Sequence, residues 1–164
     1  MSDKARVSTE EWDAWRSFID MHRQLSLVLE RDLQRTADIS AADYAVLLTL
    51  RDGKDNQLRA RELGSALAWE KSRVSHQVSR MEKRGLVERR DCTTDARGTW
   101  IGLTPSGRRA ILGAMRDHSE SLRKNFLDIV TPAELEALKS ASSRVLGAIE
   151  PPECTGDEPN CSGE

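Results

Sequence analysis

The sequence predicts a mainly α-helical fold with one small β-hairpin, in the order α-α-α-α-β-β-α-α. Apolar residues recur at intervals of three and four over most of the 164 residues, which is typical of helices that bury one face. Only two short stretches, Leu86–Asp91 and Thr99–Leu103, alternate between apolar and polar residues as half-buried strands do. Charged residues make up 32% of the chain and apolar residues 38%, which fits a soluble, helix-rich protein.

The first helix is expected to run from about Thr9 to Arg35. Ser8 and Glu11 are spaced as a capping box, in which two side chains satisfy free backbone N–H groups. A second helix is expected to begin after Ser40 and to end near Asp52-Gly53. The apolar stripe of the first helix comprises Trp15, Phe18, Ile19, Leu25, Leu29 and Leu33.

A polar loop is expected over Gly53–Gln57, followed by a short third helix over Ala60–Leu67 and a fourth over Lys71–Arg84. Gly85 is well placed to end the fourth helix in a left-handed turn. The fourth helix is expected to turn three apolar residues at helical spacing toward the core. These are Val74, Val78 and Met81.

The two strands follow, joined by the turn Cys92–Gly98. Thr104-Pro105 is typical of a helix start and predicts a long fifth helix, with Ile111, Met115, Leu122, Phe126 and Ile129 on one face. Thr131 and Glu134 form another capping box, which opens a last helix. The last helix carries Leu135, Leu138, Val145 and Ile149.

Positive charge is concentrated in the middle of the chain. Residues 51–97 contain twelve Lys or Arg and eight Asp or Glu, whereas the formal net charge of the whole chain is −2. Phosphate groups are therefore expected to bind to this middle segment. Residues 151–164 contain four acids and no Lys or Arg, and we expect them to form a disordered acidic tail.

Several classes of protein are disfavoured. No stretch approaches the ~20 apolar residues that span a bilayer, and the N-terminus lacks the apolar core of a signal peptide, so we expect a cytoplasmic protein. The three cysteines, Cys92, Cys154 and Cys161, have neither the number of a disulfide framework nor metal-site spacing. Catalytic motifs are not visible, so we expect no enzyme, no cofactor and no metal.

The third and fourth predicted helices, joined by a tight connection, have the pattern of a helix-turn-helix. The outer side of the fourth helix is expected to carry side chains that can hydrogen-bond to base edges or phosphates in the major groove of DNA. The predicted set is Lys71, Ser72, Arg73, Ser75, His76, Gln77 and Arg80. Trp69, just before this helix, stands where a small polar cap is usual and is expected to wedge the helix against its neighbours.

The turn between the strands predicts a second DNA contact. Arg97 lies between Ala96 and Gly98, so its side chain can extend without crowding into a narrow minor groove, where negative potential is concentrated. Asp95 is expected to accept backbone N–H bonds and so fix the turn that aims Arg97.

With these residues the chain resembles the MarR family of bacterial winged-helix regulators over about residues 10–150. The most specific marks are the Asp-x-Arg of the turn, called the wing in this family, and the Leu-Thr-x-x-Gly that follows it. The segments that carry the resemblance are Asp43–Leu47, Lys71–Val78, Met81–Val87, Asp95–Gly98 and Leu103–Gly107.

The resemblance implies a winged helix-turn-helix joined to a helical dimerisation domain, all within residues 1–150. Residues 40–103 would form the DNA-binding lobe, and residues 9–36 and 104–150 the dimerisation helices. It further implies a homodimeric repressor on a pseudo-palindromic operator, released by a small and commonly aromatic or phenolic ligand. The apolar stripes of the terminal helices agree with an interface, because one small lobe cannot cover them.

Three residues of the predicted dimerisation helices are candidates for lining a ligand pocket: Trp15, His22 and His118. Ordinary core packing, or an exposed histidine, would also account for them. Two other functions stay open. Cys92 at the base of the wing could make the protein a redox-responsive DNA-binding regulator, or the winged helix could serve only for protein–protein contact.

Overall fold

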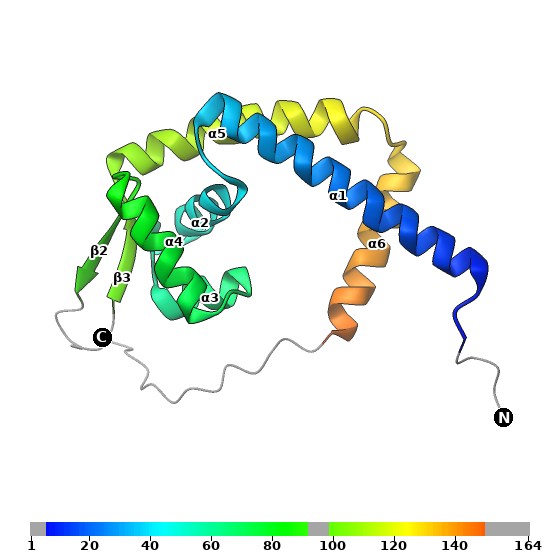
Figure 1. Ribbon diagram of the computed structural model, residues 1–164, viewed down its shortest axis with the longest axis horizontal. Helices are drawn as coiled ribbons and strands as arrows, with labels where there is room; N and C mark the ends of the chain where they lie inside the picture. The colour runs from blue at the N-terminus through cyan, green and yellow to red at the C-terminus, as the bar shows by residue number, and fades with distance from the viewer. Residues whose placement is uncertain (1–5, 92–98, 150–164) are drawn as a thin grey trace. The chain divides into compact units, whose positions relative to one another are not determined.

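The computed structural model describes residues 6–91 and 99–149, which fall into two compact units (Figure 1). The first unit ends at Ile129 and contains the helices α1 to α5 and a small sheet. The second begins at Val130 and contains the helix α6, Pro132–Ala148, which Thr131 and Glu134 cap as predicted. No helix among the described residues has the length and apolar content needed to cross a membrane.

Helix α1 spans Thr9–Ala37 and begins at the predicted capping box, and α2 spans Ala41–Asp52 and begins after Ser40 as predicted, with a capping box formed by Ser40 and Asp43. In the first box, the Ser8 N–H donates to the Glu11 carboxylate at 2.7 Å and the Glu11 N–H donates to the Ser8 hydroxyl at 3.1 Å. Helix α1 runs two residues beyond the predicted end and stops at Asp38, whose φ of 51° is left-handed. The short connection that follows leads directly into α2.

The sheet has three antiparallel strands in the order β1-β3-β2, rather than the two that the sequence predicts. Strands β2, Val87–Asp91, and β3, Thr99–Leu103, lie where the alternation placed them. The prediction of a loop throughout Gly53–Gln57 is wrong at its end, because β1 occupies Gln57–Arg59 and pairs with β3. Three residues are too few to display alternation, so the pairing of Leu58 with Ile101 leaves no trace in the sequence pattern.

Helix α3 covers Ala60–Leu67 and α4 covers Lys71–Lys83, close to the predicted bounds. Gly85 follows α4 with a φ of 70°, the left-handed turn expected there. Helix α5 spans Pro105–Leu122 and is capped by Thr104. It continues into a wider helical turn over Arg123–Leu127. The confirmed fold is thus mainly helical with a small antiparallel sheet.

The core of the first unit lies among α2, α4, α5 and the sheet, and α1 contributes only its C-terminal end. Of the six residues of the predicted stripe of α1, only Leu33 is buried, and α1 packs alongside α5 (Figure 1). The buried apolar residues are Leu33, Ile39, Val46, Leu47, Leu50, Leu63, Val74, Val78, Met81, Leu86, Val87, Ile101, Leu103, Ile111 and Ala114.

Candidate nucleic-acid interface

A tight turn joins α3 to α4 and fixes the direction in which α4 leaves it. Ala68 adopts a left-handed φ of 51°, and the Trp69 N–H donates to the Gly64 carbonyl at 2.9 Å. A Cβ on Gly64 would lie 3.2 Å from the Trp69 carbonyl oxygen, so the absence of a side chain permits the close approach. Trp69 is half-buried and packs against the core, as the predicted wedge requires.

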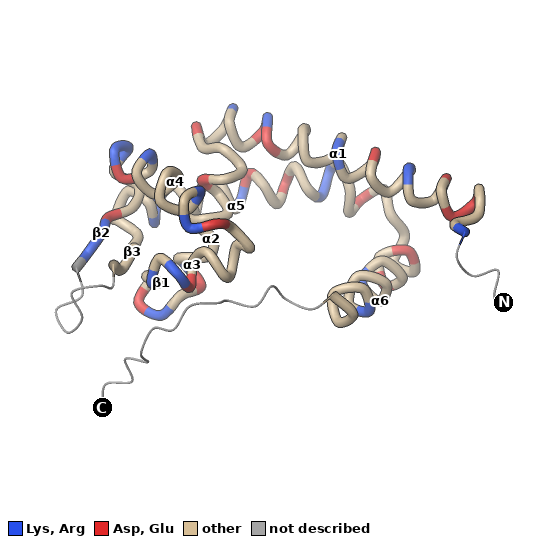
Figure 2. Tube along the Cα trace, turned by 60° about the horizontal axis from the view of Figure 1, so that its bottom comes forward, with Lys and Arg blue, Asp and Glu red and all other residues tan. Residues whose placement is uncertain are grey.

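Helix α4 separates its two faces as the sequence predicts. Val74, Val78 and Met81 are buried, and Leu63 of α3 lies in the same core cluster. The opposite face exposes six of the seven predicted contact residues, and basic segments lie along α4 and β2 (Figure 2). The six are Lys71, Ser72, Arg73, Ser75, His76 and Arg80.

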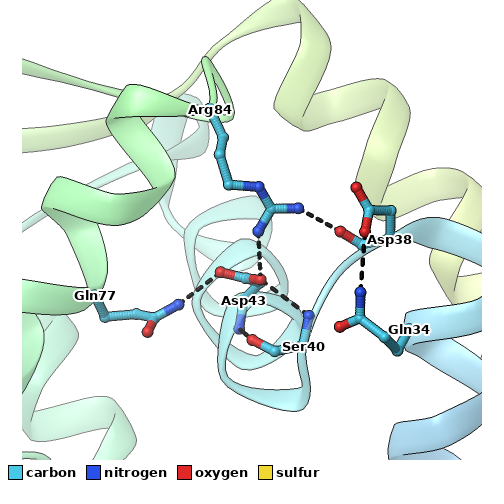
Figure 3. A network of polar contacts seen from close by, with 6 residues as sticks. All are labelled: Gln34, Asp38, Ser40, Asp43, Gln77 and Arg84. Carbon is cyan, nitrogen blue, oxygen red and sulfur yellow. Dashed lines mark hydrogen bonds and ion pairs between the residues drawn. The ribbon is translucent and has the colours of Figure 1, made fainter.

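Gln77 is the exception, and its predicted place on the outer face is wrong. Its side chain is only 7% exposed, and its amide donates to Oδ1 of Asp43 at 2.6 Å (Figure 3). The spacing of Gln77 indicates this burial, because Gln77 lies three residues after Val74 and four before Met81 and so shares their face. The prediction of an exposed position follows from the polar side chain of glutamine and not from this spacing. Gln77 is therefore a buried contact between α4 and α2.

Asp43 lies at the centre of a polar network that the sequence analysis did not predict (Figure 3). Its carboxylate is 1% exposed and accepts hydrogen bonds from Gln77, from the Ser40 N–H at 2.9 Å and from Arg84 at 2.8 Å. A buried carboxylate is tolerated only when its oxygens are satisfied and its charge is paired, and this set meets both needs. The network connects the start of α2 to the middle and the end of α4.

Arg84 extends the network to α1. One terminal nitrogen of its guanidinium bonds Asp43, and the other donates to the carbonyl oxygen of Asp38, the residue that ends α1. The amide of Gln34 in turn donates to the Asp38 carboxylate at 2.9 Å. Nothing in the sequence pattern predicts this link, because its members are separated by more than forty residues.

Arg89 ties the sheet to α4. Its guanidinium bonds the carboxylate of Glu82, the carbonyl oxygen of Ser75 at 3.2 Å and the hydroxyl of Ser79 at 2.9 Å. The arginine at the start of the hairpin is therefore engaged within the lobe, and it fixes β2 against the helix that carries the candidate contacts.

One exposed candidate of α4, Arg73, makes a cation–π contact with Trp69. The guanidinium carbon of Arg73 lies 4.1 Å from the centre of the Trp69 ring, within the range of a favourable cation–π interaction. The predicted wing residues Asp95, Arg97 and Gly98, with Cys92, lie outside the described residues. The pairing of Asp91 with Thr99 makes their segment the connection between two neighbouring antiparallel strands.

The three candidate ligand residues lie in two separate aromatic groups. On α1, the rings of Trp15 and Phe18 are 5.8 Å apart and those of Phe18 and His22 are 6.5 Å apart, all on exposed side chains. His118 of α5 instead contacts Tyr44 of α2, with 4.7 Å between ring centres. Their binding of a ligand stays a prediction.

The Tyr44–His118 contact is partly shielded from water. Burial lowers the pKa of His118 below its ordinary value and raises the pKa of the Tyr44 phenol. Nδ1 of His118 is buried and has no hydrogen-bond partner among the described residues. This part of the α2–α5 contact is therefore built from neutral rings, and the imidazole is disfavoured in its charged form.

Comparison with known proteins places the chain among transcription regulators. A model described as MarR family matches residues 37–98, which include α2 to β2. The crystal structure of Sco3205, a MarR family transcriptional regulator from Streptomyces coelicolor in complex with DNA, is 32% identical with a TM-score of 0.84, and the match covers 93% of this chain and 96% of that one.

Two further relatives agree. The structure of AbsC, a MarR family transcriptional regulator from Streptomyces coelicolor, is 32% identical with a TM-score of 0.82, over 87% of this chain and 96% of that one. The transcriptional repressor MprA of Escherichia coli strain K12 is 23% identical over 137 residues, which are 83% of this chain and 77% of MprA.

Proposed function

The chain belongs to the MarR family of transcription regulators, a family of regulators rather than enzymes, and on that premise we propose that it is a homodimeric repressor. Each protomer binds one half of a pseudo-palindromic operator in double-stranded DNA, and a small molecule releases the dimer. The observation that carries the proposal is the division of α4 into a buried apolar face and an exposed face of basic and hydroxyl side chains.

In this proposal α4 is the recognition helix and lies in the major groove, which is wide enough to admit a helix. Arg73 donates two hydrogen bonds to a guanine, the most common specific contact between protein and DNA. Lys71 at the start of the helix and Arg80 near its end bind phosphates on either side of the groove. Ser72, Ser75 and His76 complete the contact from the same exposed face.

The wing supplies the second contact. Arg97, followed by Gly98, enters the neighbouring minor groove, and Asp95 fixes the turn that aims it. The anchoring of β2 by Arg89 to Glu82 and Ser79 supports this proposal, because it holds the start of the hairpin at a constant position relative to α4. Helix α4 and strand β2, which leads into the wing, are thereby held together.

A dimer is supported by the large apolar side chains that each unit leaves exposed. In α1 these include Trp12, Trp15, Phe18 and Ile19, which are between 41% and 54% exposed. In α6 and at its C-cap, Val145, Leu146 and Ile149 are between 57% and 71% exposed. Contiguous apolar area of this kind is rare on monomers and usually marks an interface, which we assign to a second copy of the chain.

We assign repression by similarity to MprA, which is described as a transcriptional repressor. Release by a ligand requires that the ligand bind better to a dimer whose recognition helices are wrongly spaced for DNA. The contact between Tyr44 and His118 supports an aromatic or phenolic effector, since it places two half-buried rings with centres 4.7 Å apart between α2 and α5. Trp15 and His22 are further candidates on α1.

The test begins with selection of bound duplexes from a random pool by the full-length protein, followed by fluorescence anisotropy on the selected sequence. We expect a two-fold symmetric sequence, a dimer by sedimentation, and an affinity that falls as salt rises because phosphate contacts release counterions. A monomer without affinity for any duplex at low ionic strength would overturn the proposal and favour a role in protein–protein contact.

The effector is tested on the same complex. A panel of small aromatic and phenolic acids is added to the bound duplex, and loss of anisotropy is expected for at least one of them at a concentration that leaves the dimer folded. Release by peroxide in the parent protein, but not in a Cys92→Ser variant, would instead establish the redox alternative.

A further inference from the structure

We propose that Asp43 and Arg84 are positioning residues that fix the recognition helix α4 to the end of α1, and thereby set the spacing of the two DNA half-sites that the dimer accepts. This inference rests on the proposed function, because it concerns how two copies of α4 are held apart. Neither residue touches DNA in the proposal; both act through the placement of α4.

The first step is the chemistry of Asp43. A carboxylate that is 1% exposed loses nearly all of its contact with water, which is costly unless protein donors replace it. Three donors do so, from the Ser40 backbone, Gln77 and Arg84. Gln77 lies in the middle of α4 and Arg84 at its end, so a single carboxylate holds the helix at two points. Two points of attachment restrain both the rotation of α4 about its axis and its tilt.

The second step is the fork of Arg84. The planar guanidinium presents nitrogens in a fixed geometry, and here one bonds the Asp43 carboxylate while another bonds the Asp38 carbonyl at the end of α1. Carbonyl groups in the last turn of a helix lack partners within the helix, so this bond also completes α1. A lysine at this position has one nitrogen and cannot reproduce the rigid fork, although it keeps the positive charge.

The third step is the place of α1 in the proposed dimer. Its N-terminal half exposes Trp12, Trp15 and Phe18, the residues assigned above to the contact with a second copy. Its C-terminal end lies against the Asp43–Arg84 pair. A small change in the angle between α1 and α4 therefore changes the separation of the two recognition helices, and that separation must match the half-site spacing of the operator.

The experiment compares duplexes in which the two selected half-sites lie at the preferred spacing or one base pair closer or farther apart. Binding is measured by anisotropy for the parent protein and for Arg84→Lys and Asp43→Asn. The matched control is Arg35→Lys, which makes the same change at an exposed arginine of α1 that pairs with Asp32 at 3.0 Å. Circular dichroism and sedimentation establish that each variant is folded and dimeric.

We expect Arg84→Lys and Asp43→Asn to bind the duplex of preferred spacing about tenfold more weakly than the parent does. Both variants should bind the two shifted duplexes almost as well as the parent does. The difference in affinity between the spacings should therefore become smaller. Arg35→Lys should keep the parent's profile. A uniform loss at all three spacings would show only a structural role and overturn the inference, as would an unchanged profile. If the parent binds no duplex at all, the proposed function itself is wrong; if it binds with a sharp preference that both variants keep, only the inference is wrong.

Discussion

The guanidinium of Arg73 lies over the ring of Trp69, with its central carbon 4.1 Å from the ring centre. Trp69 itself is held by the core and by its backbone bond to Gly64, whereas Arg73 is exposed. An exposed arginine ordinarily loses much side-chain freedom when it binds a base. Stacking on a fixed ring removes part of that freedom before the DNA arrives, so Trp69 should strengthen the contact that Arg73 makes.

This contact predicts that Trp69 and Arg73 are coupled in DNA binding. Arg73→Ala should weaken binding by about 1–3 kcal/mol and relax the preference at one base position. Trp69→Leu should weaken DNA binding by about 0.5–1 kcal/mol when Arg73 is present. The same substitution should weaken binding much less in the Arg73→Ala background. A double-mutant cycle on the selected duplex, by anisotropy, measures the coupling.

Trp69→Phe is the control for the ring face, and it should keep most of the affinity. Urea unfolding of the four proteins of the cycle (the parent, the two single variants and the double variant) separates effects on binding from effects on stability. The packing of Trp69 against the core contributes to stability whether or not Arg73 is present. Additive losses in binding would mean that Trp69 serves only the fold.

The Leu-Thr-x-x-Gly segment predicts an effect on stability that is independent of DNA. A Cβ on Gly107 would lie 2.0 Å from the carbonyl oxygen of Leu86, which is backbone and cannot move aside. Thr104 holds the same junction, because its hydroxyl donates to the Gly85 carbonyl at 2.7 Å and accepts from the Gly107 N–H at 2.9 Å. Gly107→Ala should therefore lower the free energy of unfolding by about 3 kcal/mol in urea titrations.

Gly113 in the same helix provides the matched control. A Cβ there meets nothing within 4 Å, and alanine is the better helix former. Gly113→Ala should thus leave the free energy of unfolding unchanged or raise it by about 0.5–1 kcal/mol. Equal destabilisation by both variants would contradict the steric account of Gly107.

Short-range signals explain which parts of the fold the sequence predicts correctly. The helix starts at Ser8, Ser40 and Thr131 depend on residues three positions away, and all three capping boxes are present. The strands β2 and β3 are long enough to alternate, so they are found within a residue. Strand β1 is missed because three residues carry no period, and it becomes a strand only through its partner β3.

Long-range partners explain what the sequence does not predict. Asp43 looks like a cap, and its second role depends on Gln77 and Arg84, which lie 34 and 41 residues away. A prediction from residue type places Gln77 outside because glutamine is usually exposed, and only the buried carboxylate opposite makes its burial favourable. The stacking of Arg73 on Trp69 joins the first turn of α4 to a residue that precedes the helix, and no pattern of residue types predicts that contact.

The exposed aromatic row of α1 predicts the oligomeric state. The rings of Trp15 and Phe18 lie 5.8 Å apart, and the two side chains are 54% and 43% exposed. Burial of such a row against a second copy is favourable by about 25 cal/mol per Å² of apolar area, and a charge placed in it would remain without a partner. Phe18→Arg should therefore shift the protein toward monomer in sedimentation velocity and weaken binding to a two-fold duplex.

The control for that variant is Arg23→Ala, at an exposed position of the same helix that pairs with Asp20 at 2.9 Å. Because exposed ion pairs contribute little, this change should leave both the dimer and its DNA affinity as in the parent. A Phe18→Arg protein that remains dimeric at low micromolar concentration would place the interface elsewhere.

His118 predicts how stability depends on pH. Burial beside Tyr44 lowers the pKa of His118, so the folded protein binds this proton less tightly than the unfolded chain, in which the pKa is about 6.5. The stability that His118 contributes is therefore complete at a pH above its pKa in the unfolded chain. This stability decreases as the pH falls through that pKa, and it stops decreasing once the pH is below the pKa in the folded protein. The raised pKa of Tyr44 keeps the phenol neutral throughout this range.

His118→Phe preserves a ring against Tyr44 but cannot take up a proton. The variant should therefore lose less stability than the parent between about pH 7.5 and pH 5.5, in urea titrations at constant protein concentration. Parallel pH curves for the parent and His118→Phe would mean that the imidazole of His118 does not govern stability in this pH window.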